Sequence, residues 1–184
     1  MANATKRALV RTSTFLLLLA HALGEVSHRF DDNVLDTFDI LRFFDRGVAI
    51  YDVDGDGDLD CVTAVRTEFI EEPLGATYVL LFKGLGGNQP RNITIHATPG
   101  PTPETDRFKI DDDYDFVQEG QFYYTNYKNC VVMEHPYEGV RECLLWTMTK
   151  TFHDIPDDCM TVYKNTCKDA MKPYDKESCS EIFH

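Results

Sequence analysis

The sequence lacks the short motifs that mark common enzyme classes and small metal-binding domains. It contains no CxxC pair, so a zinc knuckle is not expected. GxSxG, HExxH and P-loop motifs are all absent, and Gly84-Leu85-Gly86-Gly87 is too short for a nucleotide-binding loop. We therefore expect neither an enzyme nor a protein with a bound cofactor.

Basic residues are also scarce. The chain has 18 Lys and Arg residues against 31 Asp and Glu residues, which gives a formal net charge of −13. A surface this acidic repels phosphate backbones, so nucleic acid is not an expected partner. It favours solubility and attracts cations instead.

The N-terminal residues 1–24 have the pattern of a secretory signal peptide. Basic residues (Lys6, Arg7 and Arg11) precede a short apolar run at 15–20, and small residues at 22–24 suit cleavage. The apolar run is too short to span a bilayer, and no later segment is suited to span one. We expect a mature chain of residues 25–184 that forms one domain. Because residues 1–24 contain three basic and no acidic residues, the mature charge would be −16.

Six cysteines follow this segment, at Cys61, Cys130, Cys143, Cys159, Cys167 and Cys179. An even number of cysteines in a secreted chain predicts disulfide bonds, although the sequence alone allows 15 connectivities. Asn92-Ile93-Thr94 is a glycosylation acceptor, which fits secretion.

The spacing of apolar and turn residues predicts an all-β chain. We expect strands at 43–51, 61–70, 77–83, 92–97, 106–110, 121–127, 130–134 and 142–148. Val34, Leu35, Phe38 and Leu41 predict a short helix behind Asp31 and Asp32, and Pro156 predicts the start of a second helix that runs to about Cys167. The segment around 136–139 is expected to be a hairpin turn, with His135 as a turn residue. Eight short strands followed by one helix predict an antiparallel barrel.

An acidic loop is the most conspicuous local pattern. Asp52, Asp54, Asp56, Asp58 and Asp60 occupy the first five ligand positions of an EF-hand loop. Thr63 stands where the bidentate acid belongs, and strands rather than helices are predicted on both sides. Two interpretations remain, a weak calcium site and an acidic hairpin turn, and the turn is favoured.

Five segments together resemble a known family. These are 128–132 (KNCVV), 142–146 (ECLLW), 155–159 (IPDDC), 174–179 (YDKESC) and 61–64 (CVTA). They resemble tick salivary lipocalins of the histamine-binding type, which include a Japanin-like branch. The resemblance implies an eight-stranded antiparallel lipocalin barrel with a short N-terminal helix and one C-terminal α-helix packed outside. It also implies a secreted, non-enzymatic protein of tick saliva that sequesters host mediators.

The resemblance further implies a disulfide pattern. The family pairs Cys61 with Cys179 and Cys130 with Cys159, which leaves Cys143 to pair with Cys167. A direct bridge between Cys130 and Cys143 is the competing arrangement.

The same resemblance bears on the ligand. Amine-binding members carry acids where this chain has Val131 and Leu144, and a buried cation needs a carboxylate partner. We therefore expect an apolar ligand, such as a sterol, fatty acid or eicosanoid, with Glu142 as one acid near the mouth. The expected lumen residues are Tyr78, Leu80, Phe82, Phe122, Tyr124, Val131, Met133, Glu142, Leu144 and Trp146. The alternatives are a histamine or serotonin scavenger, and an immune modulator that binds a host plasma or immune-cell protein with the barrel as scaffold.

Overall fold

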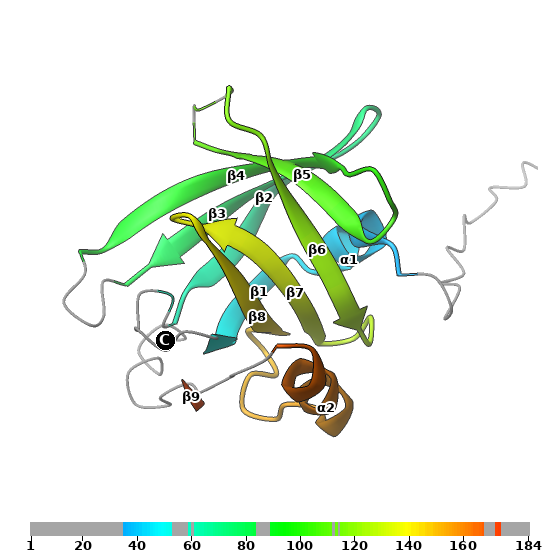
Figure 1. Ribbon diagram of the computed structural model, residues 1–184, viewed down its shortest axis with the longest axis vertical. Helices are drawn as coiled ribbons and strands as arrows, with labels where there is room; N and C mark the ends of the chain where they lie inside the picture. The colour runs from blue at the N-terminus through cyan, green and yellow to red at the C-terminus, as the bar shows by residue number, and fades with distance from the viewer. Residues whose placement is uncertain are drawn as a thin grey trace, which may run out of the picture.

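The computed structural model describes residues 35–52, 59, 61–83, 89–111, 113, 115–167 and 172–173. Its main feature is a closed antiparallel β-barrel of eight strands (Figure 1). The strands are β1 (Arg46–Asp52), β2 (Thr63–Glu71), β3 (Leu74–Phe82), β4 (Arg91–Pro99), β5 (Thr105–Ile110), β6 (Gln118–Thr125), β7 (Cys130–Tyr137) and β8 (Val140–Met148). Each strand pairs with the next, and β1 pairs with both β8 and β2, which closes the barrel. The expected fold is confirmed.

Three further elements complete the chain. Helix α1 (Thr37–Phe43) precedes the barrel, helix α2 (Asp157–Thr166) follows it, and the two-residue strand β9 (Lys172–Pro173) pairs with the end of β1. The N-cap of α1 is Asp36, whose side chain accepts hydrogen bonds from the backbone N–H groups of Phe38 and Asp39. No helix in the described ranges is both long and apolar enough to cross a membrane.

The connections divide the barrel into a mouth and a base. The ends of β1, β3, β5 and β7 and the starts of β2, β4, β6 and β8 lie at the mouth, because successive strands are antiparallel. Helix α1 lies at the base: the Thr37 N–H donates to Pro103 O between β4 and β5, at 2.8 Å. The Asp36 N–H also donates to the Tyr127 hydroxyl between β6 and β7, at 3.2 Å.

Two barrel side chains bind the C-terminal end of α1, where helix carbonyls have no partner within the helix. The Tyr78 hydroxyl approaches Leu41 O at 2.9 Å and Phe44 O at 2.5 Å. Arg66 donates to Leu41 O and Arg42 O, at 2.5 and 2.6 Å. Burial raises the pKa of Tyr78 well above its ordinary value, so the hydroxyl remains protonated and able to donate.

Removal of this hydroxyl should weaken the base of the barrel. We expect Tyr78→Phe to lower the free energy of unfolding by about 1–2 kcal/mol, because a buried carbonyl loses its donor. The control is Tyr123→Phe, whose hydroxyl binds Glu134 on the exposed outer surface and should cost less than about 0.5 kcal/mol. Urea unfolding measures both, and equal losses would contradict this role for Tyr78.

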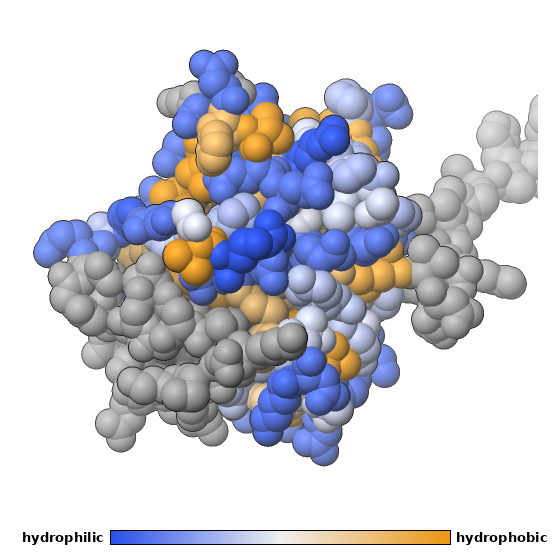
Figure 2. All heavy atoms as spheres, in the orientation of Figure 1, coloured by the Kyte–Doolittle hydropathy of each residue, from blue (hydrophilic) through white to orange (hydrophobic). Residues whose placement is uncertain are grey.

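Helix α2 covers the outer surface of β6, β7 and β8. Cys159, Tyr163 and Cys167 are spaced four residues apart and face the barrel, where each is at most 3% exposed. The strands beneath are buried on both faces: Val131 and Leu144 point inward, whereas Val132 and Leu145 pack under the helix. The remaining surface of α2 that is visible in Figure 2 is mainly hydrophilic.

Two disulfide bonds attach α2 to the barrel. Cys130 of β7 is bonded to Cys159, and Cys143 of β8 is bonded to Cys167. Both bonds agree with the predicted pairing and exclude a bridge between Cys130 and Cys143. Cys61 is also disulfide-bonded, but its predicted partner Cys179 lies outside the described residues.

Candidate ligand-binding site

Two cavities occupy the barrel lumen, one toward the mouth and one toward the base. Their volumes are about 40 Å³ and about 80 Å³. Each is large enough to hold ordered water or part of a small ligand. They share four wall residues, Leu80, Ile95, His135 and Trp146. We call these four residues the waist of the lumen.

The cavity near the mouth is closed by aromatic and apolar side chains. Phe82 and Tyr137 stack with their ring centroids 5.8 Å apart, and the Arg91 guanidinium lies 5.1 Å from the Phe82 centroid. Arg91 also binds the Tyr137 hydroxyl and, at 2.7 Å, the Glu138 carboxylate. Leu59 lines the same cavity and is 5% exposed. A ligand must pass these side chains.

The cavity near the base is more apolar and is closed by α1. Ile40, Leu41 and Phe44 come from α1 and the turn after it, and they face side chains from several strands. Those from the strands include Tyr78, Ala97, Phe122, Val131 and Met133. Tyr78 and Arg66 hold α1 in place over this end of the lumen.

Nine of the ten expected lumen residues line these cavities. They are Tyr78, Leu80, Phe82, Phe122, Val131, Met133, Glu142, Leu144 and Trp146. The expectation for Tyr124 is wrong: this residue packs outside the barrel, and its hydroxyl donates to Asp158 of α2 at 2.8 Å. Burial, together with the Asp158 carboxylate, raises the pKa of Tyr124 to about 12.

A β-bulge causes this difference. Phe122 pairs with Met133, but Tyr124 pairs with Val132, so the register shifts by one residue between them. A bulge of this kind interrupts the strict alternation of inward and outward side chains. Tyr124 therefore follows Val132 to the outer side, beneath α2.

The lumen also contains a polar pair that strand alternation alone does not explain. His135 of β7 and Asp106 of β5 approach with Nε2 and Oδ1 3.2 Å apart. The two strands are not neighbours, because β6 lies between them. The residue of β6 at this place is Gly120, which pairs directly with Asp106 and donates its N–H to Asp106 Oδ1 at 3.2 Å. The His135 side chain passes over Gly120 of β6 to reach Asp106.

Space at this crossing depends on the absence of a side chain. A Cβ atom at Gly120 would lie 2.0 Å from His135 Cδ2 and 2.4 Å from Asp106 Oδ1. The imidazole also stacks on Phe108, with centroids 4.6 Å apart, and meets Phe122 edge-on at 5.9 Å. The ring is therefore held on one edge and on its faces.

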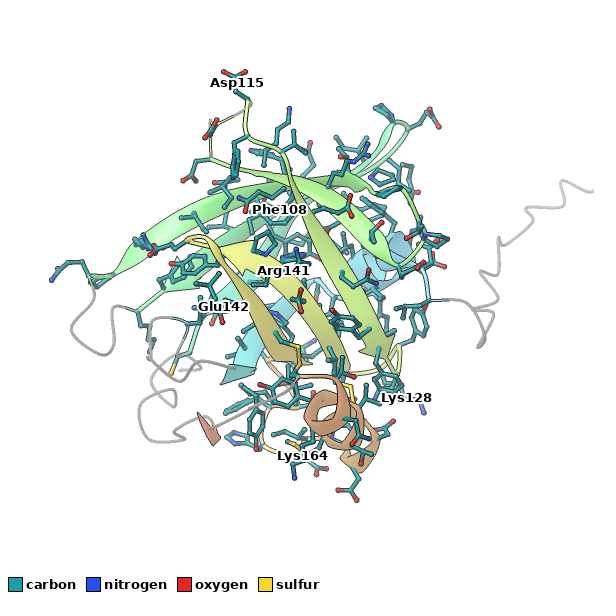
Figure 3. The ribbon with its side chains drawn as sticks, in the orientation of Figure 1. Phe108, Asp115, Lys128, Arg141, Glu142 and Lys164 are labelled. Atoms are coloured by element: carbon teal, nitrogen blue, oxygen red, sulfur yellow. A yellow bond between two sulfur atoms is a disulfide. The ribbon has the colours of Figure 1, made fainter. Side chains whose placement is uncertain are left out.

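Glu142 is a second buried acid of the lumen. It is 3% exposed, lines the cavity near the mouth and pairs directly with His135 across β7 and β8. Figure 3 shows Glu142 and Phe108 within the barrel. Asp106 is 1% exposed, so two carboxylates and one imidazole stand among otherwise largely apolar walls.

Sequence reasoning missed His135 and Asp106. The turn was predicted to start at Pro136, but β7 continues to Tyr137 and the turn consists of Glu138 and Gly139, both with positive φ. Such a two-residue turn suits a tight hairpin. Strand alternation from Val131 through Met133 would have placed His135 in the lumen. No sequence signal links it to Asp106.

Most of the acidic loop lies outside the described residues. Asp54, Asp56, Asp58 and Asp60 are in this part, and of Asp52 only the backbone is described. Across the residues that the structure does describe, no group of three or more His, Cys, Asp or Glu could hold a metal ion. The signal peptide also lies outside them. Asn92 is exposed, at the start of β4.

Two solved structures of other proteins have a fold similar to that of this chain. Japanin from Rhipicephalus appendiculatus, solved bound to cholesterol, matches 72% of this chain and 94% of its own, with a TM-score of 0.54 and 13% identity. The amine binding protein of Rhodnius prolixus, solved as its tryptamine complex, matches 75% of this chain and 85% of its own, with a TM-score of 0.50 and 9% identity. These likenesses show the fold.

No curated protein sequence matches this chain. The family model described as "Tick histamine binding protein" matches residues 52–181. This range includes β2 to β8, α2 and the two disulfide bonds that join α2 to the barrel. The chain therefore belongs to the tick histamine-binding protein family.

Proposed function

We propose that this chain is a secreted tick salivary lipocalin that sequesters a small, largely apolar ligand and so modulates host inflammatory or immune defence. The observation that carries the proposal is the apolar lining of both cavities. Val131 and Leu144 lie in that lining. The family resemblance implies that amine-binding members carry acids at these two positions. Removal of apolar surface from water contributes roughly 25 cal/mol per Å², so such a ligand needs no charged partner.

Secretion is supported by the predicted signal peptide and by the disulfide bonds of α2, which persist in oxidising compartments. Asn92 is exposed and is available for glycosylation. A ligand that enters at the mouth meets Leu59, Tyr137 and Arg91, which binds the Tyr137 hydroxyl.

A biogenic amine is the second candidate ligand, because Asp106 and Glu142 are buried carboxylates that line the lumen. Japanin with cholesterol and the Rhodnius protein with tryptamine show that this fold accepts both ligand classes. The two candidates differ in charge, so they are separable by experiment.

Native mass spectrometry of the purified protein with an equimolar mixture of cholesterol, 1-decanol, decanoic acid, histamine and serotonin tests the proposal. We expect a one-to-one adduct with an apolar compound and little with histamine. Adducts with the amines alone would establish the second candidate instead. The absence of any adduct would contradict a ligand-binding role.

The bulge in β6 allows a matched test of which side chains touch the ligand. Phe122→Ala should weaken ligand binding by about tenfold, because a phenyl ring leaves the wall of the cavity near the base. Tyr124→Ala, two residues away but beneath α2, should change the dissociation constant by less than about twofold. Fluorescence titration measures both constants. Equal weakening would show that the described lumen is not the binding site.

A further inference from the structure

Only one edge of the His135 imidazole contacts Asp106. Its Cδ2–Nε2 edge faces Gly120 and Asp106, so the opposite edge, with Nδ1, faces away from β6. Within the described part of the chain, Nδ1 makes no hydrogen bond. The side chain is 18% exposed and forms part of the waist, which borders both cavities. A ligand that fills the lumen therefore meets the Nδ1 edge.

Asp106 determines what Nδ1 can do. An ionised carboxylate only accepts hydrogen bonds, and Asp106 Oδ1 already accepts one from the Gly120 N–H. The hydrogen of the Asp106–His135 contact therefore belongs to Nε2. When the imidazole is neutral and donates from Nε2, Nδ1 carries a lone pair and accepts.

The charges around the imidazole exclude one class of ligand. Asp106 lies on one side of His135, and Glu142 lies directly across the strand pair on the other. A ligand carboxylate at the waist would be a third acid in a largely apolar lumen. Burial of a charge beside like charges is strongly unfavourable. A neutral or cationic donor meets no such barrier.

We propose that His135, positioned by Asp106 across Gly120, selects ligands whose polar group donates a hydrogen bond and rejects those with a carboxylate. The ligand class is a largely apolar molecule with one hydroxyl or amino group at the level of the waist. Its apolar parts occupy the cavities on either side. This inference rests on the proposed function and narrows it, because it retains alcohols such as sterols and excludes fatty acids and acidic eicosanoids.

Four compounds of one chain length test the inference: 1-decanol, decyl methyl ether, decylamine and decanoate. Trp146 is the single tryptophan of the chain and lines both cavities, so its fluorescence reports binding of each. At neutral pH we expect decanol to bind about tenfold tighter than its methyl ether, which cannot donate, and decanoate to bind weakest. Decylamine, which also donates, should bind at least as tightly as the ether. Its rank against decanol identifies whether the lumen prefers a hydroxyl or an amine.

Two variants test the roles of the residues. His135→Phe retains an aromatic ring against Phe108 but has no hydrogen-bond acceptor, so the tenfold preference for decanol over the ether should fall below about threefold. Asp106→Asn removes one negative charge and should strengthen decanoate binding relative to decanol. The affinity for the ether serves as the control and should change by less than about twofold in His135→Phe.

The outcomes separate this inference from the proposed function. If none of the four compounds changes Trp146 fluorescence or forms an adduct, both fail. If all four bind wild-type protein with equal affinity, or decanoate binds tightest, ligand binding stands and the selection by His135 is wrong. Because this comparison uses the wild-type protein, it decides the matter even if a variant does not fold.

Discussion

Leu144→Glu should abolish most of the affinity for an apolar ligand. Leu144 is 6% exposed and lines the cavity near the mouth, so the new carboxyl group would lose its water when a ligand enters. Burial of an incompletely bonded polar group costs about 2 kcal/mol, which corresponds to roughly a thirtyfold weaker dissociation constant. Titration with decanol or with the ligand identified by mass spectrometry measures the change.

Ile70→Glu is the matched control. Ile70 is 40% exposed on β2, so the same change from an aliphatic side chain to an acid stays in water. It should leave the dissociation constant unchanged within about twofold. If both variants bind the apolar ligand as wild type does, the ligand lies elsewhere. If Leu144→Glu instead gains high affinity for histamine, one acid is sufficient to convert the lumen to amine binding.

Gly120→Ala should produce a large loss of stability from a single methyl group. The added Cβ would lie 2.0 Å from His135 and 2.4 Å from Asp106, and both groups are confined. Overpacking of a core costs about 1–3 kcal/mol, and here it would also break the buried Asp106–His135 contact. We expect a loss of about 3 kcal/mol and a melting temperature lower by roughly 6–12 °C.

Gly75→Ala is the control for the backbone effect of this substitution. Gly75 also lies in a strand, but the nearest atom to an added Cβ is Ala97 O at 3.5 Å, an ordinary contact. The stability of this variant should be within about 1 kcal/mol of wild type. Thermal unfolding followed by circular dichroism compares the two. If both variants melt at the same temperature, the crossing at Gly120 is not as tight as described.

The barrel could be predicted from the sequence because its strands are short, apolar and separated by clear turn residues. The predicted strands at 77–83, 130–134 and 142–148 are examples, and apart from Lys83 they lie within β3, β7 and β8. The pairing implied by the family resemblance added the position of α2, since each of its two bonds joins the helix to a neighbouring strand. Local pattern and long-range constraint therefore agreed.

The lumen was predictable only where strands alternate regularly. On β8, Glu142, Leu144 and Trp146 point inward as a period of two requires. On β6, the bulge turns the Tyr124 side chain to the outer face of the barrel, and no residue type in this segment predicts a bulge. The Asp106–His135 contact requires the registers of β5, β6 and β7 to place Gly120 between the two side chains. A local sequence pattern does not encode the register of three strands.

Titration of Trp146 fluorescence with 1-decanol and with histamine, each against wild-type protein, tests the central claim most directly. Trp146 lies in the waist, so any ligand that occupies either cavity touches its surroundings. We expect a saturable one-to-one change in Trp146 fluorescence with decanol at micromolar concentrations and a much weaker response to histamine. A tight, saturable response to histamine with none to decanol would contradict it.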